Sequence, residues 1–496
     1  MLFNSLQYLL FLPAVVTCFW LSGKRFRPLI LLCASYYFYM SWYAPYCLLL
    51  AALTTLNYLL GRSIDKAKGQ SAKRKFLFGL GLVLNLGCLL FFKYTNFLVD
   101  CCSSLLRTVP HNTAQLSLPL QIIVPLAISF FVFEFVHYLG DIYSGQKPID
   151  SPIRFALFAA FFPSQIAGPI KRFEDFDTQI LHMRSFSSPM FLQGINLILE
   201  GLFKKVALGD NLVPIVEKGF SSIQYLAPVD AWIAALAFTF EIYYDFSGYT
   251  DIGRGSAMLL GINLPENFNK PYFSVSLIDF WRRWHMSLSS WLRDYLYKPL
   301  GGSRGGTFAR NRNLLITMLL GGLWHGASWH FVIWGAFHGI GLIVNHTFRK
   351  LFPAPAETVS PNSNTTPTIG LKSLATGLFT FVFVILGWIL FRADTFENAL
   401  SFYKHMFVAA APCFESGFLV QAFIASTLPA AFSLYALFHG LTSLHQHLST
   451  NTNFGQHWWL KIKPTPVILL PGYAAYALLI LCLASKKAAP FIYFQF

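Results

Sequence analysis

Long apolar stretches separated by short polar loops run along the whole chain. In Phe76–Leu98 and Leu118–Leu139, hydrophobic residues follow one another without the regular alternation that marks a strand. Lipid offers no hydrogen-bond partners, so a chain that crosses it must form helices or a closed barrel. A barrel strand would alternate polar and apolar positions over about 10 residues. The pattern therefore predicts helices, each of which needs about 20 apolar residues to cross a bilayer.

The apolar segments vary in length, and several are too short to cross a membrane upright. Such segments must be tilted, broken or re-entrant, which is tolerated only where protein or a cavity surrounds them. We expect an all-α, polytopic integral membrane protein with about 11–13 transmembrane or re-entrant helices. The predicted segments are Leu6–Leu21, Leu29–Trp42, Leu48–Leu60, Phe76–Leu98, Leu118–Leu139, Ile153–Phe162, Met190–Leu208, Ala231–Tyr244, Leu314–Leu323, His330–Phe348, Ser373–Phe391, Phe418–Leu441 and Val467–Ala484.

Composition supports a membrane location. The 496 residues are 55% hydrophobic and 12% charged, whereas soluble domains carry about 25% charged residues. The formal net charge of +15 lies mainly in short loops between apolar segments. That distribution is typical of loops that face an anionic cytoplasmic leaflet. We therefore expect contact with membrane lipid and no nucleic-acid partner.

The basic loops also predict an orientation. Basic residues cluster at 24–27 and in Lys66–Lys75, and two predicted crossings separate these loops, so both lie on one side. The positive-inside rule makes that side cytoplasmic and places the N-terminus outside. No basic residue precedes Lys24, so Leu6–Leu21 is predicted to be a transmembrane helix and not a signal peptide. The expected location is the cell inner (plasma) membrane.

The chain shows no internal repeat and no stretch with the composition of a soluble domain. We predict one membrane-embedded domain over residues 1–496, with a motif-bearing core at 128–340 and C-terminal helices at 373–496. Residues 354–367 are rich in Pro, Ser, Thr and Asn, which predicts a flexible loop.

Polar islands within the apolar pattern are the candidate functional positions, because ionisable residues in a membrane are expensive and face the protein interior. In the first, Phe162–Ile170, two prolines and a glycine break any helix. It is either a loop at the membrane surface or a broken segment that lines a cavity. In the second, Glu241 and Asp245 share a helix face. They either do acid–base work or orient neighbours such as Arg254 and stabilise helix packing.

The third island runs from Asp279 to Gly302 and is rich in Arg and Trp. It is either an interfacial amphipathic helix or a cytoplasmic rim that holds the phosphates of an anionic donor. The fourth, Leu320–His330, places a Trp-His pair between glycines at the junction of two apolar helices. His325 and His330 are five residues apart, which is the wrong interval for a shared metal on one helix face, so no metal site is expected.

Three of these motifs resemble the membrane-bound O-acyltransferase family. Tyr243–Asp251, Asp279–Gly302 and Trp324–Gly326 follow one another in the order found in that family, and the resemblance covers roughly Ser129–His338. The chain looks most like the branch of bacterial alginate O-acetylases and peptidoglycan O-acetyltransferases. The resemblance implies tilted helices around a central tunnel, with an acyl donor entering from the cytoplasm and an acceptor from outside.

The resemblance also implies the site. His325 matches the family's catalytic histidine and His285 its second functional histidine. The donor would be acetyl-CoA or a related acyl thioester, with no permanently bound cofactor or metal. An extracytoplasmic acetyltransferase partner would complete transfer to a polysaccharide. The substrate-binding residues would be Trp324, Asp245, Ser247, Tyr249, Arg282, Arg283, Arg293 and Tyr295.

The residue types suit that chemistry. Transfer from a thioester to a hydroxyl needs a base, and imidazole titrates near 6.5. His325 lies between Gly322 and Gly326, where we expect the backbone to open to a substrate. His285 would orient the thioester or stabilise charge on its carbonyl oxygen. Two alternatives stay open: transfer of D-alanine from a carrier protein to a cell-wall polymer, and a transporter that uses the polar islands as a permeation path.

Overall fold

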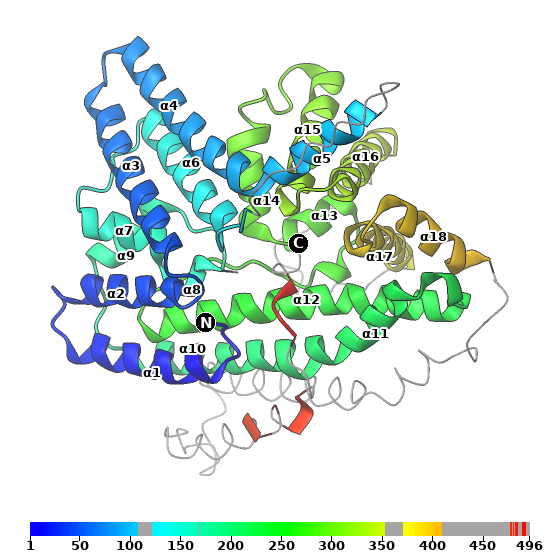
Figure 1. The fold of residues 1–496 in the computed structure, drawn as a ribbon, viewed down its shortest axis with the longest axis horizontal. Helices are drawn as coiled ribbons and strands as arrows, with labels where there is room; N and C mark the ends of the chain where they lie inside the picture. Colours follow the sequence, from blue (N-terminus) through cyan, green and yellow to red (C-terminus); the bar gives the residue numbers. More distant parts are fainter. Residues whose placement is uncertain are drawn as a thin grey trace, which may run out of the picture. The chain divides into compact units, whose positions relative to one another are not determined.

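The computed structural model describes residues 1–107, 122–166, 168–352 and 371–408, together with 477–478, 480, 482–484 and 489–492. Within these residues the chain forms helices and no strand (Figure 1). The α-helices are α1 (Leu6–Leu21), α2 (Arg27–Met40), α3 (Tyr46–Lys66), α4 (Ser71–Leu89), α5 (Thr95–Arg107), α6 (Ile128–Ser144), α7 (Pro152–Ala160), α8 (Phe162–Gln165), α9 (Phe173–Leu181), α10 (Ser188–Leu202), α11 (Asp210–Ser221), α12 (Pro228–Leu259), α13 (Leu277–Arg283), α14 (Met286–Leu292), α15 (Gly306–His325), α16 (Trp329–Leu351), α17 (Leu371–Arg392) and α18 (Phe396–Phe407). The π-helical turns are η1 (Leu90–Tyr94), η2 (Phe203–Gly209) and η5 (Arg293–Tyr297), and the 3₁₀ turns are η3 (Ile223–Tyr225) and η4 (Pro271–Phe273).

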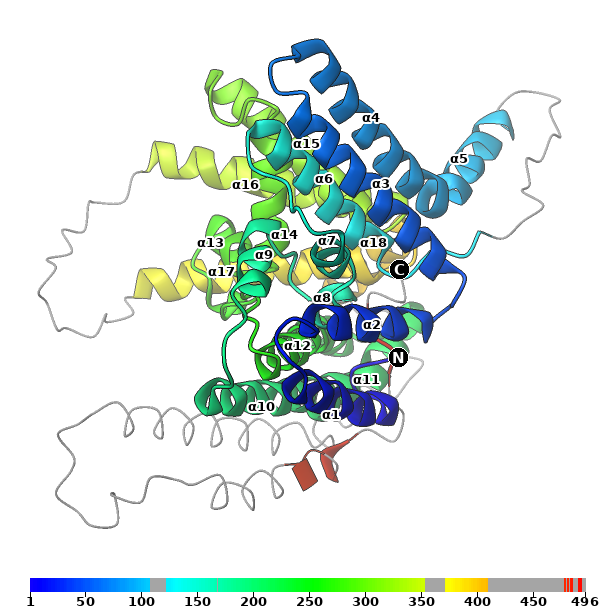
Figure 2. The same cartoon turned by 90° about the vertical axis from the view of Figure 1, so that its left-hand side faces the viewer.

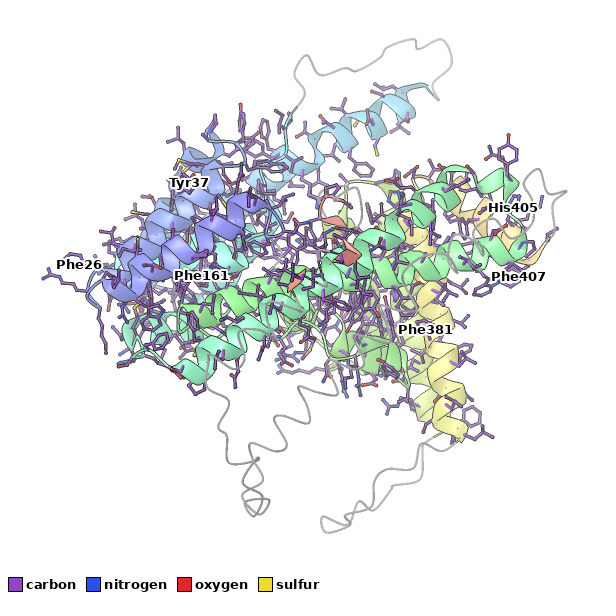
Figure 3. The ribbon with its side chains drawn as sticks, turned by 90° about the horizontal axis from the view of Figure 1, so that it is seen from below. Phe26, Tyr37, Phe161, Phe381, His405 and Phe407 are labelled. Atoms are coloured by element: carbon purple, nitrogen blue, oxygen red, sulfur yellow. The ribbon has the colours of Figure 1, made fainter. Side chains whose placement is uncertain are left out.

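The prediction of an all-α integral membrane protein is confirmed. In the described part of the chain, four helices are long and apolar enough to cross a membrane: Tyr46–Lys66, Ser71–Leu106, Trp329–Leu351 and Leu371–Arg392. Apolar side chains also point outward, as lipid contact requires. Phe26 and Tyr37 are 59% and 57% exposed, and Phe26 projects away from the neighbouring helices (Figure 3).

The sequence located most segments but misjudged several lengths. Leu6–Leu21 is found as predicted, whereas Ala231–Tyr244 lies in the N-terminal part of the 32-residue α12 and falls well short of its end. Charged residues after Tyr244 interrupted the apolar pattern, yet the helix continues because their side chains find partners inside the protein. Phe418–Leu441, most of Val467–Ala484 and the loop at 354–367 lie outside the described residues.

The described chain divides into two compact units. The first comprises Met1–Ile195 and Gly253–Phe391, and the second Asn196–Ile252 and Arg392–Gln495. The predicted single domain over residues 1–496 stays a prediction.

In the first unit, small residues let α3 and α4 approach α6 closely (Figures 1 and 2). A Cβ atom on Gly61 would lie 2.5 Å from the ring of Tyr138, and one on Gly81 would lie 2.5 Å from Leu139. A pair of buried amides joins α3 to α4, because Asn57 and Asn85 exchange hydrogen bonds of 3.0 and 2.7 Å. Small residues and paired amides are what hold helices together where lipid removes the hydrophobic driving force.

Helices α15 and α16 form a second close pair in the same unit. A Cβ atom on Gly322 would lie 2.2 Å from the carbonyl oxygen of Phe331, and one on Gly335 would lie 2.3 Å from that of Met318. The two backbones therefore touch directly, and this contact fixes the end of α15.

Candidate functional site

His325 is the last residue of α15 and lies buried among aromatic rings. Its ring centroid is 4.9 Å from Trp324, 5.1 Å from Trp334 and 5.2 Å from Phe391, and each contact is edge to face. The three rings confine the imidazole from several sides, so its direction is set by packing.

The glycines around His325 do not open the backbone, contrary to the expectation from sequence. Gly322 faces the Phe331 carbonyl, and a Cβ atom on Gly326 would lie 2.0 Å from the Phe331 ring. Gly326 itself is extended, with φ −159° and ψ 151°. Both glycines are therefore needed so that Phe331 can pack against the turn that carries His325.

His285 occupies a break between α13 and α14, so the Arg- and Trp-rich island is not one continuous amphipathic helix. His285 has φ 42° and ψ 56°, in the left-handed region. Among the described residues, only Ala127 and Lys270 share a positive φ without being glycine. Such conformations cost of order 1 kcal/mol or more and cluster at functional sites. The side chain is 1% exposed.

A chain of hydrogen bonds fixes the His285 ring. Asn267 Oδ1 accepts from the backbone N–H and the hydroxyl of Ser287, at 3.1 and 2.7 Å. It also lies 3.2 Å from His285 Nδ1. Because a backbone N–H can only donate, the Asn267 atom at this position is its oxygen, and His285 Nδ1 must carry the proton. His285 Nε2 then carries the lone pair.

This tautomer bears on the role predicted for His285. A neutral imidazole whose Nε2 holds a lone pair accepts a hydrogen bond, and it does not donate one to a carbonyl oxygen. An Nε2 atom that accepts a hydrogen bond could orient a substrate hydroxyl. It could not stabilise an oxyanion, which requires a hydrogen-bond donor. Asn267 and Ser287 were missed by sequence reasoning, since a polar residue in a loop gives no signal of its partner.

Trp324 joins the two histidines. Its ring contacts His285 at 6.2 Å and His325 at 4.9 Å between centroids. It also stacks on Phe133, which stacks on Trp291 at 3.8 Å. The predicted residues His285, Trp324 and His325 are thus brought together by the packing of α6, α14 and α15, although His285 is 40 positions from His325 in the chain.

The first polar island packs beside this group. Phe162, Ser164 and Gln165 are buried, and the N–H of Ile170 donates to the Ser287 hydroxyl at 3.0 Å. The described part of the segment is therefore buried inside the protein and is not an exposed loop. It supports the same hydrogen-bonded chain that ends on His285.

The predicted substrate-binding residues of the third island lie in two places. Arg293 and Tyr295 line a cavity of about 790 Å³, with Arg172 and Lys298. Arg282 is exposed and Arg283 pairs with Asp279 at 2.9 Å, and neither lines this cavity.

Tyr295 and Asp294 organise the wall of the cavity. The Tyr295 hydroxyl donates to both oxygens of Asp141, at 2.7 and 2.8 Å, and accepts from Arg172. Asp294 lies 2.6 Å from Arg172, 3.0 Å from Arg293 and 2.8 Å from Lys298. Partial burial would raise the pKa of Asp294, but hydrogen bonds from Arg293 and Lys298 outweigh it and hold that pKa below its ordinary value. Asp294 therefore stays ionised, and three cations surround one carboxylate.

The cavity lies at the end of α6 that faces the start of α4. Phe78 and Leu82 of α4 line it, and Arg74 donates to the carbonyl of Ile142 at 3.0 Å. It is therefore at the same end of these helices as the Lys66–Lys75 loop.

Asp245, Ser247 and Tyr249 belong to the second unit and are buried there. Lys205 lies 2.5 Å from Asp245 and 2.7 Å from Asp210, and the N–H of Ile492 donates to Asp245 at 2.7 Å. This supports the packing interpretation of the Asp245 carboxylate, with one correction. The partner is Lys205 and not Arg254, which instead pairs with Glu266 at 3.1 Å.

Buried imidazoles in a helical chain with apolar spanning helices are the arrangement expected of a membrane-embedded functional site. The model of the membrane-bound O-acyltransferase family matches residues 3–385, and the chain belongs to this family. It is an acyltransferase of the integral membrane type.

Named relatives agree with this assignment. The chain is 42% identical over 411 residues to a probable alginate O-acetylase AlgI of Azotobacter vinelandii, which covers 82% of this chain and 78% of the relative. It is 36% identical to the probable alginate O-acetylase AlgI of Pseudomonas putida, over the full length of both chains. It is also 36% identical to the peptidoglycan O-acetyltransferase of Helicobacter pylori, over 78% of this chain and 74% of the relative.

Proposed function

We propose that this protein takes an acetyl group from a cytoplasmic thioester donor and passes it across the membrane for O-acetylation of an exported or cell-surface polysaccharide, such as alginate or peptidoglycan. The observation that carries the proposal is the placement of His285 and His325 against one tryptophan ring. The names of the relatives support the acetyl group and the class of acceptor.

His325 acts as the general base in this proposal. The acceptor hydroxyl gives its proton to the imidazole while its oxygen attacks the thioester carbonyl carbon. When the tetrahedral intermediate collapses, the C–S bond breaks and the imidazolium returns the proton to the leaving thiolate. General-base help of this kind contributes about 10²–10⁴-fold. His285, which accepts at Nε2, orients the hydroxyl or the donor.

The cavity beside Tyr295 is proposed to hold the donor. Its volume of about 790 Å³ is in the range of ligand sites, and the guanidinium groups of Arg172 and Arg293 suit phosphate. The positive-inside rule makes this end cytoplasmic, where acetyl-CoA is present. An extracytoplasmic acetyltransferase is the proposed partner that hands the acetyl group to the polymer.

Inside-out membrane vesicles test the proposal. Vesicles that contain the protein are supplied with radiolabelled acetyl-CoA, and acetyl transfer is measured as the amount of base-labile radiolabel. The amount and the thermal stability of the folded protein are measured in parallel. His325→Ala should fold and bind donor yet lose nearly all transfer. In His285→Ala, the rate of acetyl transfer should fall by a factor similar to or smaller than that in His325→Ala.

His338→Phe is a matched control, since His338 is also buried among aromatic rings and contacts Trp334 at 4.8 Å. It should keep transfer. A well-folded His325→Ala protein that transfers acetyl near the wild-type rate would contradict the proposal, and loss of stability in proportion to activity would assign His325 a structural role.

A further inference from the structure

The C-terminal end of α15 requires hydrogen-bond donors from outside its own helix. The last four carbonyl groups of an α-helix have no partner within it, and here they include those of Leu323, Trp324 and His325. Many helices end in a left-handed turn whose N–H groups bond these carbonyls. Gly326 is extended instead, so that source of donors is missing at this end.

Two consecutive residues of η1 supply the donors. The Tyr94 hydroxyl donates to the carbonyl oxygen of Leu323 at 2.8 Å. The Lys93 ammonium donates to the carbonyl of Trp324 and, at 3.1 Å, to that of His325. Three successive carbonyls at the end of α15 are therefore bonded from one π-helical turn.

The charge of Lys93 also matches its position. The C-terminal end of a helix carries partial negative charge, so a cation is stabilised there. Lys93 Nζ is 5.9 Å from the centroid of the Trp324 ring, a distance at which a cation is attracted to the face of an indole. Lys93 lies in the apolar helix Ser71–Leu106, where a charged side chain is expensive and marks function. Short π-helical stretches are likewise frequent at functional sites.

We infer that Lys93 and Tyr94 form a clamp on the last turn of α15, and that Lys93 is a positioning residue for His325. This inference rests on the proposed function, because the clamp acts through His325. By fixing the peptide planes of Trp324 and His325, the clamp fixes the directions in which both side chains leave the backbone. A shift of about 1 Å at a catalytic group costs up to about 10²-fold in rate.

The vesicle assay with radiolabelled acetyl-CoA tests the clamp through the maximal rate and the KM for acetyl-CoA. Lys93→Met should lower the maximal rate about 10–100-fold and leave KM within about 2-fold. Lys93→Arg should recover most of the rate, since it keeps the charge and the donors. Tyr94→Phe should lower the rate about 2–10-fold, which corresponds to the net free energy of one hydrogen bond. Thr95→Val is the matched control and should behave as wild type, because the Thr95 hydroxyl donates to the Phe91 carbonyl one turn earlier, at 2.5 Å, and not to α15.

The outcomes separate the clamp from a merely structural role and from the proposed function. A wild-type rate in Lys93→Met overturns the clamp, as does a loss that Lys93→Arg fails to rescue. If Lys93→Met does not fold, a wild-type rate in Tyr94→Phe overturns it. His325→Ala is measured alongside. Retained transfer in His325→Ala refutes the proposed function, whereas an inactive His325→Ala beside a fully active Lys93→Met refutes the clamp alone.

Discussion

Asn267 Oδ1 lies 3.2 Å from Nδ1 of His285 and, by accepting two hydrogen bonds from Ser287 as well, selects the tautomer of that imidazole. The amide is fully buried, so water does not compete for this position. Asn267 and His285 are 18 positions apart in the chain, and the loop before α13 brings them together. A single amide therefore decides which nitrogen of His285 carries the proton.

Replacing Asn267 should impair transfer through His285. In Asn267→Ala, Nδ1 loses its acceptor and the ring is free to change tautomer, so the rate of acetyl transfer should fall about 10–100-fold. Asn269→Ala, in the same loop but exposed, should transfer at the wild-type rate. The vesicle assay measures both, and equal rates in the two variants would show that the tautomer is unimportant.

Tyr295 should affect donor binding more than chemistry. Tyr295→Phe removes the hydroxyl that joins Asp141 to Arg172 at the cavity wall, so KM for acetyl-CoA should rise about 2–10-fold, the worth of one hydrogen bond. Tyr297→Phe is the control, since the Tyr297 hydroxyl contacts Ser303 at 2.8 Å and Tyr297 does not line the cavity. A fall in the maximal rate at unchanged KM would place the donor elsewhere.

Adding a side-chain atom at the contact between α15 and α16 should destabilise the protein. Gly322→Ala places a Cβ 2.2 Å from the Phe331 carbonyl oxygen, and such overpacking should lower the free energy of unfolding by about 1–3 kcal/mol. Gly87→Ala in α4 meets no atom within 4 Å and should be neutral or stabilising by up to about 1 kcal/mol. Thermal unfolding in detergent distinguishes the two, and equal stability would show that the helices separate readily.

Orientation in the membrane can be read from cysteine labelling in intact cells. Gln70 is exposed between α3 and α4, within the basic loop, so Gln70→Cys in a cysteine-free background should resist an impermeant reagent. Gln7→Cys, exposed in the first turn of α1, should react because the N-terminus is predicted to lie outside. Labelling at position 70 would reverse the predicted topology and move the donor cavity to the other face.

The sequence predicted the helices, which the structure confirms, and two candidate histidines, whose role stays a prediction. It did not predict the contacts that hold those histidines in place. Long apolar runs predict helices because lipid leaves the backbone no other partner, and Trp324–Gly326 is recognisable as a motif. By contrast, Lys93 was hidden inside the predicted segment Phe76–Leu98, since a single lysine hardly changes an apolar pattern. Its partners are carbonyl groups of the distant residues Trp324 and His325. Backbone carbonyls carry no sequence signal, so contacts of this kind emerge only from the packing of α15.

The left-handed backbone of His285 also bears on how the protein can evolve. Glycine would adopt φ 42° more readily than histidine does. Selection for heat resistance alone would therefore favour glycine at this position, whereas the role proposed for His285 would retain the imidazole. The chain keeps a residue with a strained backbone at this break, so under the proposed role a stabilising substitution at position 285 would lower activity.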